Sequence, residues 1–259
     1  MLKITYIALL ILFFVSSCKQ ESEKKVNYKS DIEDLDKKYG HLFDGKEDSI
    51  PINNHMPKAF STSKYEIRFL DIDRELFYHY KSNANNTPLI TDLPKNIKQK
   101  DSCFYIKHGS FKDTLCDNLN DDFSDEYIDY HFLGHWDSLK YAIFESGIYE
   151  ELIYFIYNIE NGNKTFLWNI PVLSPDKKFV VTSSFDLVAG FQPNGIQMFE
   201  IIEKKIEKEF EIEFELWGPD SCYWINENEV VFKRIILDFD DNSVKNEEYT
   251  LMKISKLKV

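Results

Sequence analysis

The chain has 259 residues, of which 43% are hydrophobic and 15% aromatic, and its 44 acidic against 31 basic residues give a formal net charge of −13. This apolar content argues against intrinsic disorder and suffices for one large hydrophobic core or two small ones. The negative charge, together with the lack of a basic stripe interleaved with aromatics, argues against nucleic acid as a partner, because such a surface repels phosphate backbones.

Residues 1–17 have the layout of a secretory signal peptide. Lys3 precedes an unbroken apolar run, residues 7–15, and two serines follow the run directly before Cys18. A helix rises roughly 1.5 Å per residue, so this run is too short to cross about 30 Å of hydrocarbon. A short apolar run between a cation and small residues is typical of a cleaved export signal.

The cleavage region carries a more specific motif. Val15-Ser16-Ser17-Cys18 resembles the lipobox of bacterial lipoproteins, with valine where that motif usually has leucine. The resemblance implies a diacylglyceryl thioether on Cys18, cleavage before it and acylation of the new amino terminus. Two or three acyl chains hold a protein at a membrane almost permanently, because each buried methylene contributes about 0.8 kcal/mol. An ordinary signal peptide with a chance cysteine is the alternative.

Residues 18–29 are polar and predict a flexible tether from the lipid to the folded part. Within them, Lys19-Gln20-Glu21-Ser22-Glu23 resembles the charged tags that route some lipoproteins to the outer face of the outer membrane. A plain solvated tether is the other interpretation. We therefore expect a lipid-anchored protein of the cell envelope, on the periplasmic or surface-exposed face of the outer membrane.

Residues 30–63 predict one short helix followed by an irregular connector. Ser30-Asp31-Ile32-Glu33 fits a capping box, and Gly40 stands where a glycine would end the helix. Proline and polar residues are frequent from residue 41 to 63, which is typical of a connector.

Residues 64–259 have the pattern of an all-β domain. Aromatic and β-branched runs at Tyr65–Ile72 and Glu75–Tyr80 predict strands. Two hairpins follow later in the chain. One has the Asn161-Gly162 pair preferred by type I′ turns, and the other, residues 195–216, alternates strictly between apolar residues and glutamates in its second half.

Three cysteines follow Cys18, and an exported protein meets oxidising surroundings where disulfides persist. A hairpin with its turn at His108-Gly109-Ser110-Phe111 would place Cys103 directly opposite Cys116. Opposed Cβ atoms are about 4.5–5.5 Å apart, close to the reach of a disulfide. We therefore expect a Cys103–Cys116 bridge, with Cys222 an unpaired small core residue.

A repeat of apolar strand, tight turn and apolar strand occurs three times, at residues 130–146, 170–184 and 222–235. It resembles the blade of a β-propeller over roughly Tyr127 to Lys258, and Ser174-Pro175-Asp176-Lys177 resembles the SPDGK turn of propeller repeats, with Lys178 at or next to the place of the glycine. The resemblance implies antiparallel meanders in a propeller-like arrangement, small or incomplete, whereas a β-sandwich is the alternative.

The last repeat has strands for three of four positions in a blade, after which the chain ends. An open sheet edge there would expose unpaired amides. We therefore predict that Tyr65–Ile72 pairs with a strand within Glu248–Lys256 and brings the two ends of the β domain together.

No metal or cofactor is expected from the sequence. His131 and His135 are four residues apart but fall across a strand and Gly134, without a third ligand. The oxygen-rich segment Asp117–Glu126 lacks the register of an EF-hand loop and predicts a solvated acidic loop, and Asp238–Ser243 predicts a hairpin tip.

No enzyme class is indicated by the candidate catalytic residues. Ser61 with Lys64, and Ser174 with Lys177, have β-lactamase-type spacing but lie in a connector and a turn, without further motifs. Glu145, Glu150 and Glu151 flank Gly147 and would act as glycosidase carboxylates only if the fold brought them to a suitable separation.

Two functions remain open. The first is a membrane-tethered binding module that uses a β scaffold to bind a cationic protein, a peptide or a glycan. The second is an envelope hydrolase whose carboxylates converge only in the fold. A deep cleft with two carboxylates would favour the hydrolase, and a flat or aromatic-lined face would favour the binding module.

Overall fold

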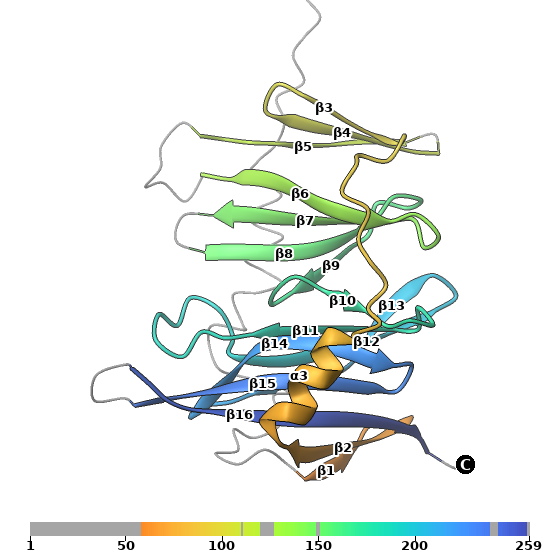
Figure 1. Cartoon of the computed structure of the whole chain (residues 1–259). Helices are drawn as coiled ribbons and strands as arrows, with labels where there is room; N and C mark the ends of the chain where they lie inside the picture. The colour runs from red at the N-terminus through yellow and green to blue at the C-terminus, as the bar shows by residue number, and fades with distance from the viewer. Residues whose placement is uncertain (1–57, 110, 120–126, 149–150, 239–242, 258–259) are drawn as a thin grey trace, which may run out of the picture.

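The computed structural model describes residues 58–109, 111–119, 127–148, 151–238 and 243–257 (Figure 1). The expected lipobox, tether and helix at Ser30–Gly40 lie outside the described residues, as does most of the segment Asp117–Glu126. The described part is all-β with a single helix, as the sequence predicts. It contains no helix that is long and apolar enough to cross a membrane.

Four antiparallel sheets make up the fold. In order of adjacent strands, the first sheet is β3 (Ile97–Lys100), β4 (Cys103–His108) and β5 (Phe111–Cys116), and the second is β6 (Asp129–Trp136), β7 (Tyr141–Ile148), β8 (Glu151–Asn158) and β9 (Lys164–Leu167). The third is β10 (Val172–Leu173), β11 (Phe179–Ser184), β12 (Gly195–Ile202) and β13 (Lys205–Glu213). The fourth is β1 (Ala59–Ser61), β2 (Tyr65–Ile72), β16 (Ser243–Lys256), β15 (Glu229–Asp238) and β14 (Trp217–Asn226).

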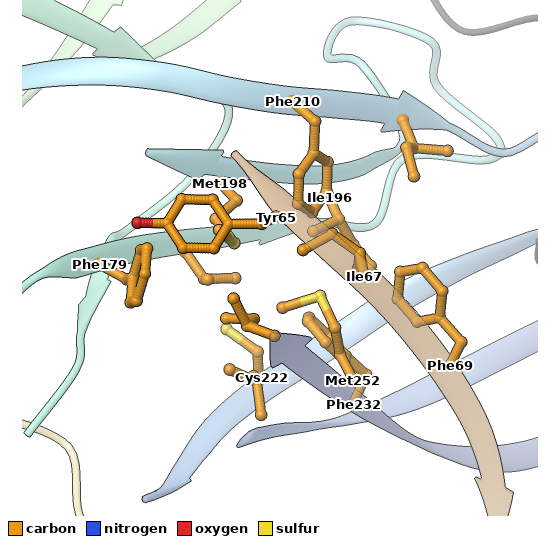
Figure 2. Packing of buried hydrophobic residues seen from close by; sticks show 14 of the residues in the cluster. Tyr65, Ile67, Phe69, Phe179, Ile196, Met198, Phe210, Cys222, Phe232 and Met252 are labelled. Atoms are coloured by element: carbon orange, nitrogen blue, oxygen red, sulfur yellow. The ribbon is translucent and has the colours of Figure 1, made fainter. Parts of the chain in front are cut away.

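The sheets stack face to face in a row, from β3–β5 at one end to the sheet of β1 and β2 at the other (Figure 1). A cluster of buried side chains fills each of the three spaces between neighbouring sheets. Phe104 and Phe144 pack between the first and second sheets, and Ile156 and Val180 between the second and third. The third space holds the largest cluster, which includes Ile67, Met198, Phe210 and Met252 (Figure 2). Alternation along each strand supplies these layers, because every second side chain points into a space between sheets.

The four sheets do not close into a ring. Among the described residues, no core cluster joins β3–β5 to the sheet that contains β16. Helix α3 (Arg74–Ser82) covers the outer face of that last sheet instead, where Phe77 packs against Val231, Tyr249 and Leu251. The blade-like repeats are therefore real meanders, but they form an open stack rather than a closed propeller.

Helix α3 corrects the prediction of a strand at Glu75–Tyr80. Asp73 caps the helix, since its side chain accepts a hydrogen bond from the Leu76 N–H. Phe77 and Tyr80, three residues apart, both pack on the sheet, whereas Tyr78 is exposed. The spacing of the packed residues is thus helical, and the high aromatic content of the segment concealed it.

The predicted pairing of the chain ends is confirmed. β2 and β16 are antiparallel neighbours, with Tyr65 opposite Lys256 and Ile72 opposite Tyr249. β1 adds a fifth strand beyond β2, so the segment expected to be a connector to residue 63 contributes a strand to the sheet.

A strap, residues 83–96, runs from the end of α3 to β3 along one side of the stack (Figure 1). It bonds to each sheet in turn: Asn85 N donates to Trp224 O, Thr87 N to Leu173 O, Ile90 N to His135 O, and Lys107 N to Asn96 O. The first three contacts fall on β14, β10 and β6, each of which is an edge strand of its sheet. The strap therefore covers backbone groups that would otherwise be exposed at these sheet edges.

Two turns differ from their predicted form. Only Gly162 of the Asn161-Gly162 pair has a positive φ, and Tyr157 pairs with Lys164, so the β8–β9 loop is longer than a two-residue type I′ turn. In the β10–β11 turn, Lys177 rather than Lys178 has a positive φ and therefore takes the place of the glycine in the SPDGK motif.

Candidate binding site

His131 and His135, which the sequence analysis set aside as metal ligands, lie in different surroundings on β6. His131 is exposed and its Nε2 lies 3.1 Å from Asp129 Oδ2, whereas His135 is buried and its Nδ1 donates to the carbonyl of Ile90 in the strap. A bulge between Phe132 and Gly134 separates them. No group of three His, Cys, Asp or Glu side chains in the described part of the chain is arranged to hold a metal ion.

The carboxylates proposed for glycoside hydrolysis do not converge in the described region. Glu145 is opposite Tyr154 in the β7–β8 hairpin, and Glu151 is opposite Ile148. Opposed residues share a face of the sheet, whereas Glu145 and Ile148, three apart on β7, point to opposite faces. Glu145 and Glu151 therefore point away from one another. Glu150 lies outside the described residues.

In neither Ser–Lys pair of the described residues are the two side chains hydrogen-bonded to one another, and each residue has a structural role instead. Ser174 is fully buried; its Oγ donates to Asp176 and accepts the N–H groups of Lys178 and Phe179. The Nζ of Lys177 donates to Ser138 instead of approaching Ser174. Ser61 lies in β1, and Lys64 is held by glutamates of the neighbouring sheet.

These glutamates form an ion cluster that the sequence analysis missed. Lys64 Nζ lies 2.8 Å from Glu200 and 2.7 Å from Glu209, and the Tyr65 hydroxyl donates to Glu200. Burial alone would raise the pKa of Glu200, but hydrogen bonds from Lys64 and Tyr65 outweigh it and lower that pKa. Hydrogen bonds to Glu200 and Glu209 raise the pKa of Lys64. Lys64 and Glu200 are thus held in their charged forms, and the cluster joins the start of β2 to β12 and β13.

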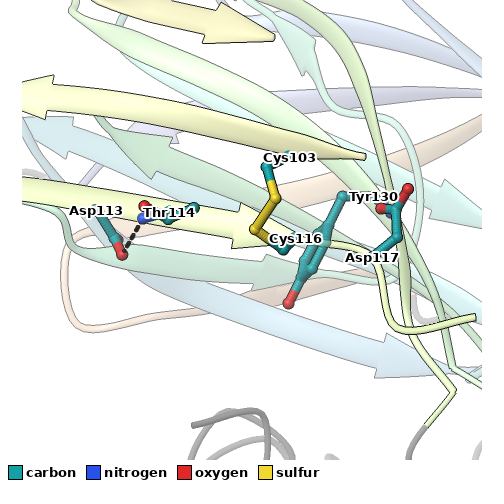
Figure 3. The surroundings of a disulfide bond; sticks show 6 residues. All are labelled: Cys103, Asp113, Thr114, Cys116, Asp117 and Tyr130. Carbon is teal, nitrogen blue, oxygen red and sulfur yellow. Dashed lines mark hydrogen bonds between the residues drawn. A yellow bond between two sulfur atoms is a disulfide. The ribbon is translucent and has the colours of Figure 1, made fainter. Parts of the chain in front are cut away.

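The predicted disulfide is confirmed. Cys103 and Cys116 lie directly opposite one another on β4 and β5 and are bonded (Figure 3). Next to the bridge, Asp117 accepts a hydrogen bond from the N–H of Tyr130, which ties the end of β5 to β6. Cys222 is a buried free thiol, as expected, and burial raises its pKa to about 12.

The clearest candidate site is the loop between β11 and β12, residues 185–194. Asp186 organises it, because its carboxylate accepts hydrogen bonds from the N–H groups of Ala189, Gly190 and Gln192. Gly190 has a positive φ of 69°, which a glycine adopts without strain. The backbone of this loop is therefore held by internal bonds rather than by packing of its own side chains.

Hydrogen bonds of Asn194 also hold the two ends of the loop in place. Asn194 is buried, and its amide donates to the carbonyls of Phe214 and Trp217 while its oxygen accepts the N–H of Asp186. A Cβ on Gly218 would lie only 2.3 Å from Asn194 Oδ1 and from the ring of Phe185. Glycine at this position thus permits the close approach of the loop to the start of β14.

This ordered loop holds apolar side chains in solvent. We call the following group the apolar loop end: Phe185, Val188 and Phe191 of the loop, Leu152 of β8 and Leu216 of the β13–β14 turn, which are all at least 38% exposed. Val188 has the largest exposed fraction of the group, 59%. The Gln192 side chain contacts the carbonyl of Leu152, which places the loop against the start of β8. Exposed apolar side chains gathered on an ordered loop are typical of an interaction site.

A small apolar pocket of about 50 Å³ opens beside the loop. Its walls come from β8, β9 and the loop, and include Leu152, Phe166, Trp168 and Phe191. Trp168 is 4% exposed, and its indole N–H has no hydrogen-bond partner within the described part of the chain. A buried donor without a partner is rare in folded proteins, and this one belongs to a residue that lines the pocket.

The floor of the pocket is polar but already bonded. Gln197 lines it, and its side-chain oxygen accepts from the backbone N–H of Trp168 and from the hydroxyl of Thr182. The Gln197 amide donates to Glu211. Burial, and then repulsion by Glu211, raises the pKa of the nearby Glu213 on the same strand. Glu211 also forms an ion pair with Lys208 at 2.8 Å, so part of the negative charge behind the pocket is compensated.

The three stretches of chain that form the apolar loop end carry no positive charge, whereas β9, which also lines the pocket, begins with Lys164. Residues 141–163, 179–203 and 209–232 contain no Lys, Arg or His, but they include Glu151, Asp186, Glu211, Glu213 and Glu215. The sequence alone contains this signal, although only the fold shows that the three stretches meet. The formal charge of these three stretches is therefore negative.

Two larger hollows, of about 580 and 630 Å³, lie elsewhere on the surface and have mixed polar and charged linings. The larger one includes Arg234, which is already bound to Asp71 and Glu248 at 2.8 and 2.7 Å. No protein-family model, curated protein or solved structure matches this chain.

Proposed function

We propose that the protein is a binding module of the cell envelope, and that the apolar loop end takes a cationic peptide segment of a partner protein through an apolar side chain. The lipid anchor expected at Cys18 would hold the module at the membrane. The observation that supports this proposal most is the loop itself: Asp186 and Asn194 order its backbone while Val188 and Phe191 remain exposed. Ordering in advance lowers the entropy cost of association.

The chemistry of the ligand follows from the pocket. Its volume of about 50 Å³ suits one side chain, whereas pockets for small-molecule ligands are typically about 300–1,000 Å³. The Trp168 N–H would donate to a carbonyl oxygen such as that of a peptide bond. The stretches of chain that form the apolar loop end carry acidic residues and no basic ones, which favours a cationic neighbour over an anionic one.

A direct test uses the full chain and two synthetic peptides. One peptide carries lysine and leucine, and the other has glutamate in place of each lysine. We expect the cationic peptide to bind the native protein and the acidic peptide not to bind, as measured by calorimetry. The double variant Val188→Ser with Phe191→Ser is expected to lose at least about tenfold in affinity, because two exposed anchors are removed.

The matched control changes exposed apolar residues on the strap, Ile90→Ser with Leu93→Ser, which are 46% and 39% exposed. It should bind the cationic peptide as the native protein does. Equal loss in both double variants would show that general surface hydrophobicity, and not the loop, is responsible. Capture from the native envelope with the tagged native and loop-variant proteins would then identify the partner. Loop-dependent capture of a glycan in place of a protein would contradict the proposal.

A further inference from the structure

The sheet β3–β5 ends the stack, and only one of its faces is packed. Ile97, Phe104, Ile106 and Leu115 point toward the second sheet and are buried in the core cluster between them. The strands also contact the second sheet on this side: Phe104 packs against Phe144, and the hydroxyl of Tyr157 donates to Asp113. Within the described part of the chain, no side chain of the opposite, outer face belongs to a core cluster.

The outer face is basic, in contrast to the rest of the chain. The strand register places Lys98, Tyr105 and Thr114 side by side, then Lys107 beside Lys112, and Lys100 beside the disulfide of Cys103 and Cys116. We call Lys98, Lys100, Lys107, Lys112 and Tyr105 the lysine face. No acidic residue stands at any outer position of the three strands, although the whole chain has 44 acidic against 31 basic residues.

None of the four lysines forms an ion pair within the described part of the chain. The ion pairs that are present use other cations, such as Lys64, Lys178 and Lys233. Tyr105, at the centre of the face, is 45% exposed. If the face served only to keep the end of the stack soluble, glutamate would do so equally well, and this chain uses glutamate freely on its other strands.

We propose that the lysine face docks on an anionic lipid surface. Each lysine close to such a surface contributes about 1 kcal/mol, and the aliphatic stems and the tyrosine ring suit the interface between headgroups and acyl chains. The disulfide holds β4 and β5 together, so the face is presented as one unit. An elongated polyanion such as nucleic acid would extend past this face and meet the remaining negative surface, whereas a planar bilayer meets the end sheet alone.

The lipid expected on Cys18 is not required for this docking but is compatible with it. Residues 18–57 would span about 130 Å if fully extended. The stack contains three sheet spacings of about 10 Å each. A chain anchored through its N-terminus therefore has enough length for the opposite end of the stack to face the same bilayer.

The experiment uses the full chain with Tyr105→Trp as a fluorescent reporter on the lysine face. The four native tryptophans are at most 5% exposed, so a quencher in the lipid reports mainly on the new indole. The matched reporter variant is Tyr78→Trp, which changes a residue of α3 that is 41% exposed at the other end of the stack. Both variants are mixed with vesicles of brominated phosphatidylglycerol or of brominated phosphatidylcholine.

We expect the anionic vesicles, and not the neutral ones, to quench the reporter at position 105, and neither kind of vesicle to quench the reporter at position 78. Adding Lys98→Glu and Lys107→Glu to the Tyr105→Trp variant should weaken the effect of the anionic vesicles by at least about tenfold in lipid concentration.

Two outcomes would overturn the proposal. Equal quenching of the two reporters would do so, because it would reflect anchoring alone. A change in the position-105 reporter on addition of heparin or DNA, but not of anionic vesicles, would also do so and would favour a soluble polyanion as the ligand.

Discussion

Ile67 lies directly opposite Ile254, so a strand near the start of the described chain is hydrogen-bonded to the strand at its end. Both side chains are buried in the core cluster between the third and fourth sheets. Ile67, which Figure 2 shows among its neighbours in this cluster, has no exposed surface. The pairing closes the last sheet, because β16 would otherwise leave its backbone groups unpaired on that side.

Removal of the chain from Glu248 onward is therefore expected to unfold the last sheet. A milder test is Ile67→Ala, which should lower the free energy of unfolding by about 2–5 kcal/mol through lost burial and a cavity. Leu70→Ala on the same strand is the control, because Leu70 is 45% exposed and should cost less than about 1 kcal/mol. Urea unfolding followed by tryptophan fluorescence measures both. Equal effects would contradict the assigned faces of β2.

The ion cluster of Lys64 and Glu200 predicts a dependence of stability on pH. The pKa of Glu200 is lowered from its ordinary value of 4.5, so its stabilising contribution is complete above that pH and is lost as the pH falls through the lower folded-state pKa. Glu200→Gln should reduce stability near pH 7 and flatten the dependence below pH 4.5. Thermal unfolding between about pH 3 and pH 7 measures it. Identical pH profiles for variant and native protein would rule out this role.

The unpartnered indole of Trp168 makes a prediction about ligand binding. Trp168→Phe retains an aromatic ring in the pocket but removes the N–H donor. If that donor bonds to the ligand, the affinity for the lysine–leucine peptide should fall roughly fivefold, equivalent to about 1 kcal/mol. Trp136→Phe is a suitable control, because its indole N–H is also buried without a described partner but Trp136 does not line the pocket. Peptide titration distinguishes the two variants, and equal affinities would contradict the role of the Trp168 donor.

The oxidation state of the cysteines can be measured directly. A non-reduced digest should contain a peptide that links Cys103 to Cys116, whereas Cys222 should be a free thiol. Because burial raises the pKa of Cys222 to about 12, it should not react with a thiol reagent at about pH 8 in the native protein. It should react fully once the protein is unfolded. Rapid native reaction would show that Cys222 is accessible.

The lipobox predicts that Cys18→Ala abolishes lipidation. Cells that are fed an alkyne fatty acid should label the native protein but not the variant, and the variant should retain an uncleaved signal or leave the membrane fraction. Ser17→Ala is a control that keeps the cysteine and a small residue before it. Label on the Cys18→Ala variant would refute the predicted modification site.

The sequence alone determined those features that depend on local pattern. Alternation of apolar and polar residues identified the strands, and hairpin register placed Cys103 opposite Cys116 without reference to the rest of the fold. The count of strands in the last repeat predicted that Tyr65–Ile72 pairs with the C-terminal strand, because an unpaired edge is unfavourable. The aromatic content of Glu75–Tyr80 led to an incorrect strand, since a helix of three turns or fewer has too few residues to show its period clearly.

Only the tertiary structure decided how the sheets stack and which side chains meet. The stack could close into a ring only if the outer faces of its two end sheets packed against one another, and α3 occupies one of these faces. The contacts of Lys64 with Glu200 and Glu209 join the start of β2 to a different sheet, so no local pattern reveals them.

The apolar loop end brings together three stretches of chain that lack cations, and the lysine face forms because strand register aligns lysines from β3, β4 and β5. Such sites depend on contacts between residues distant in sequence, and only the packing of the sheets establishes those contacts.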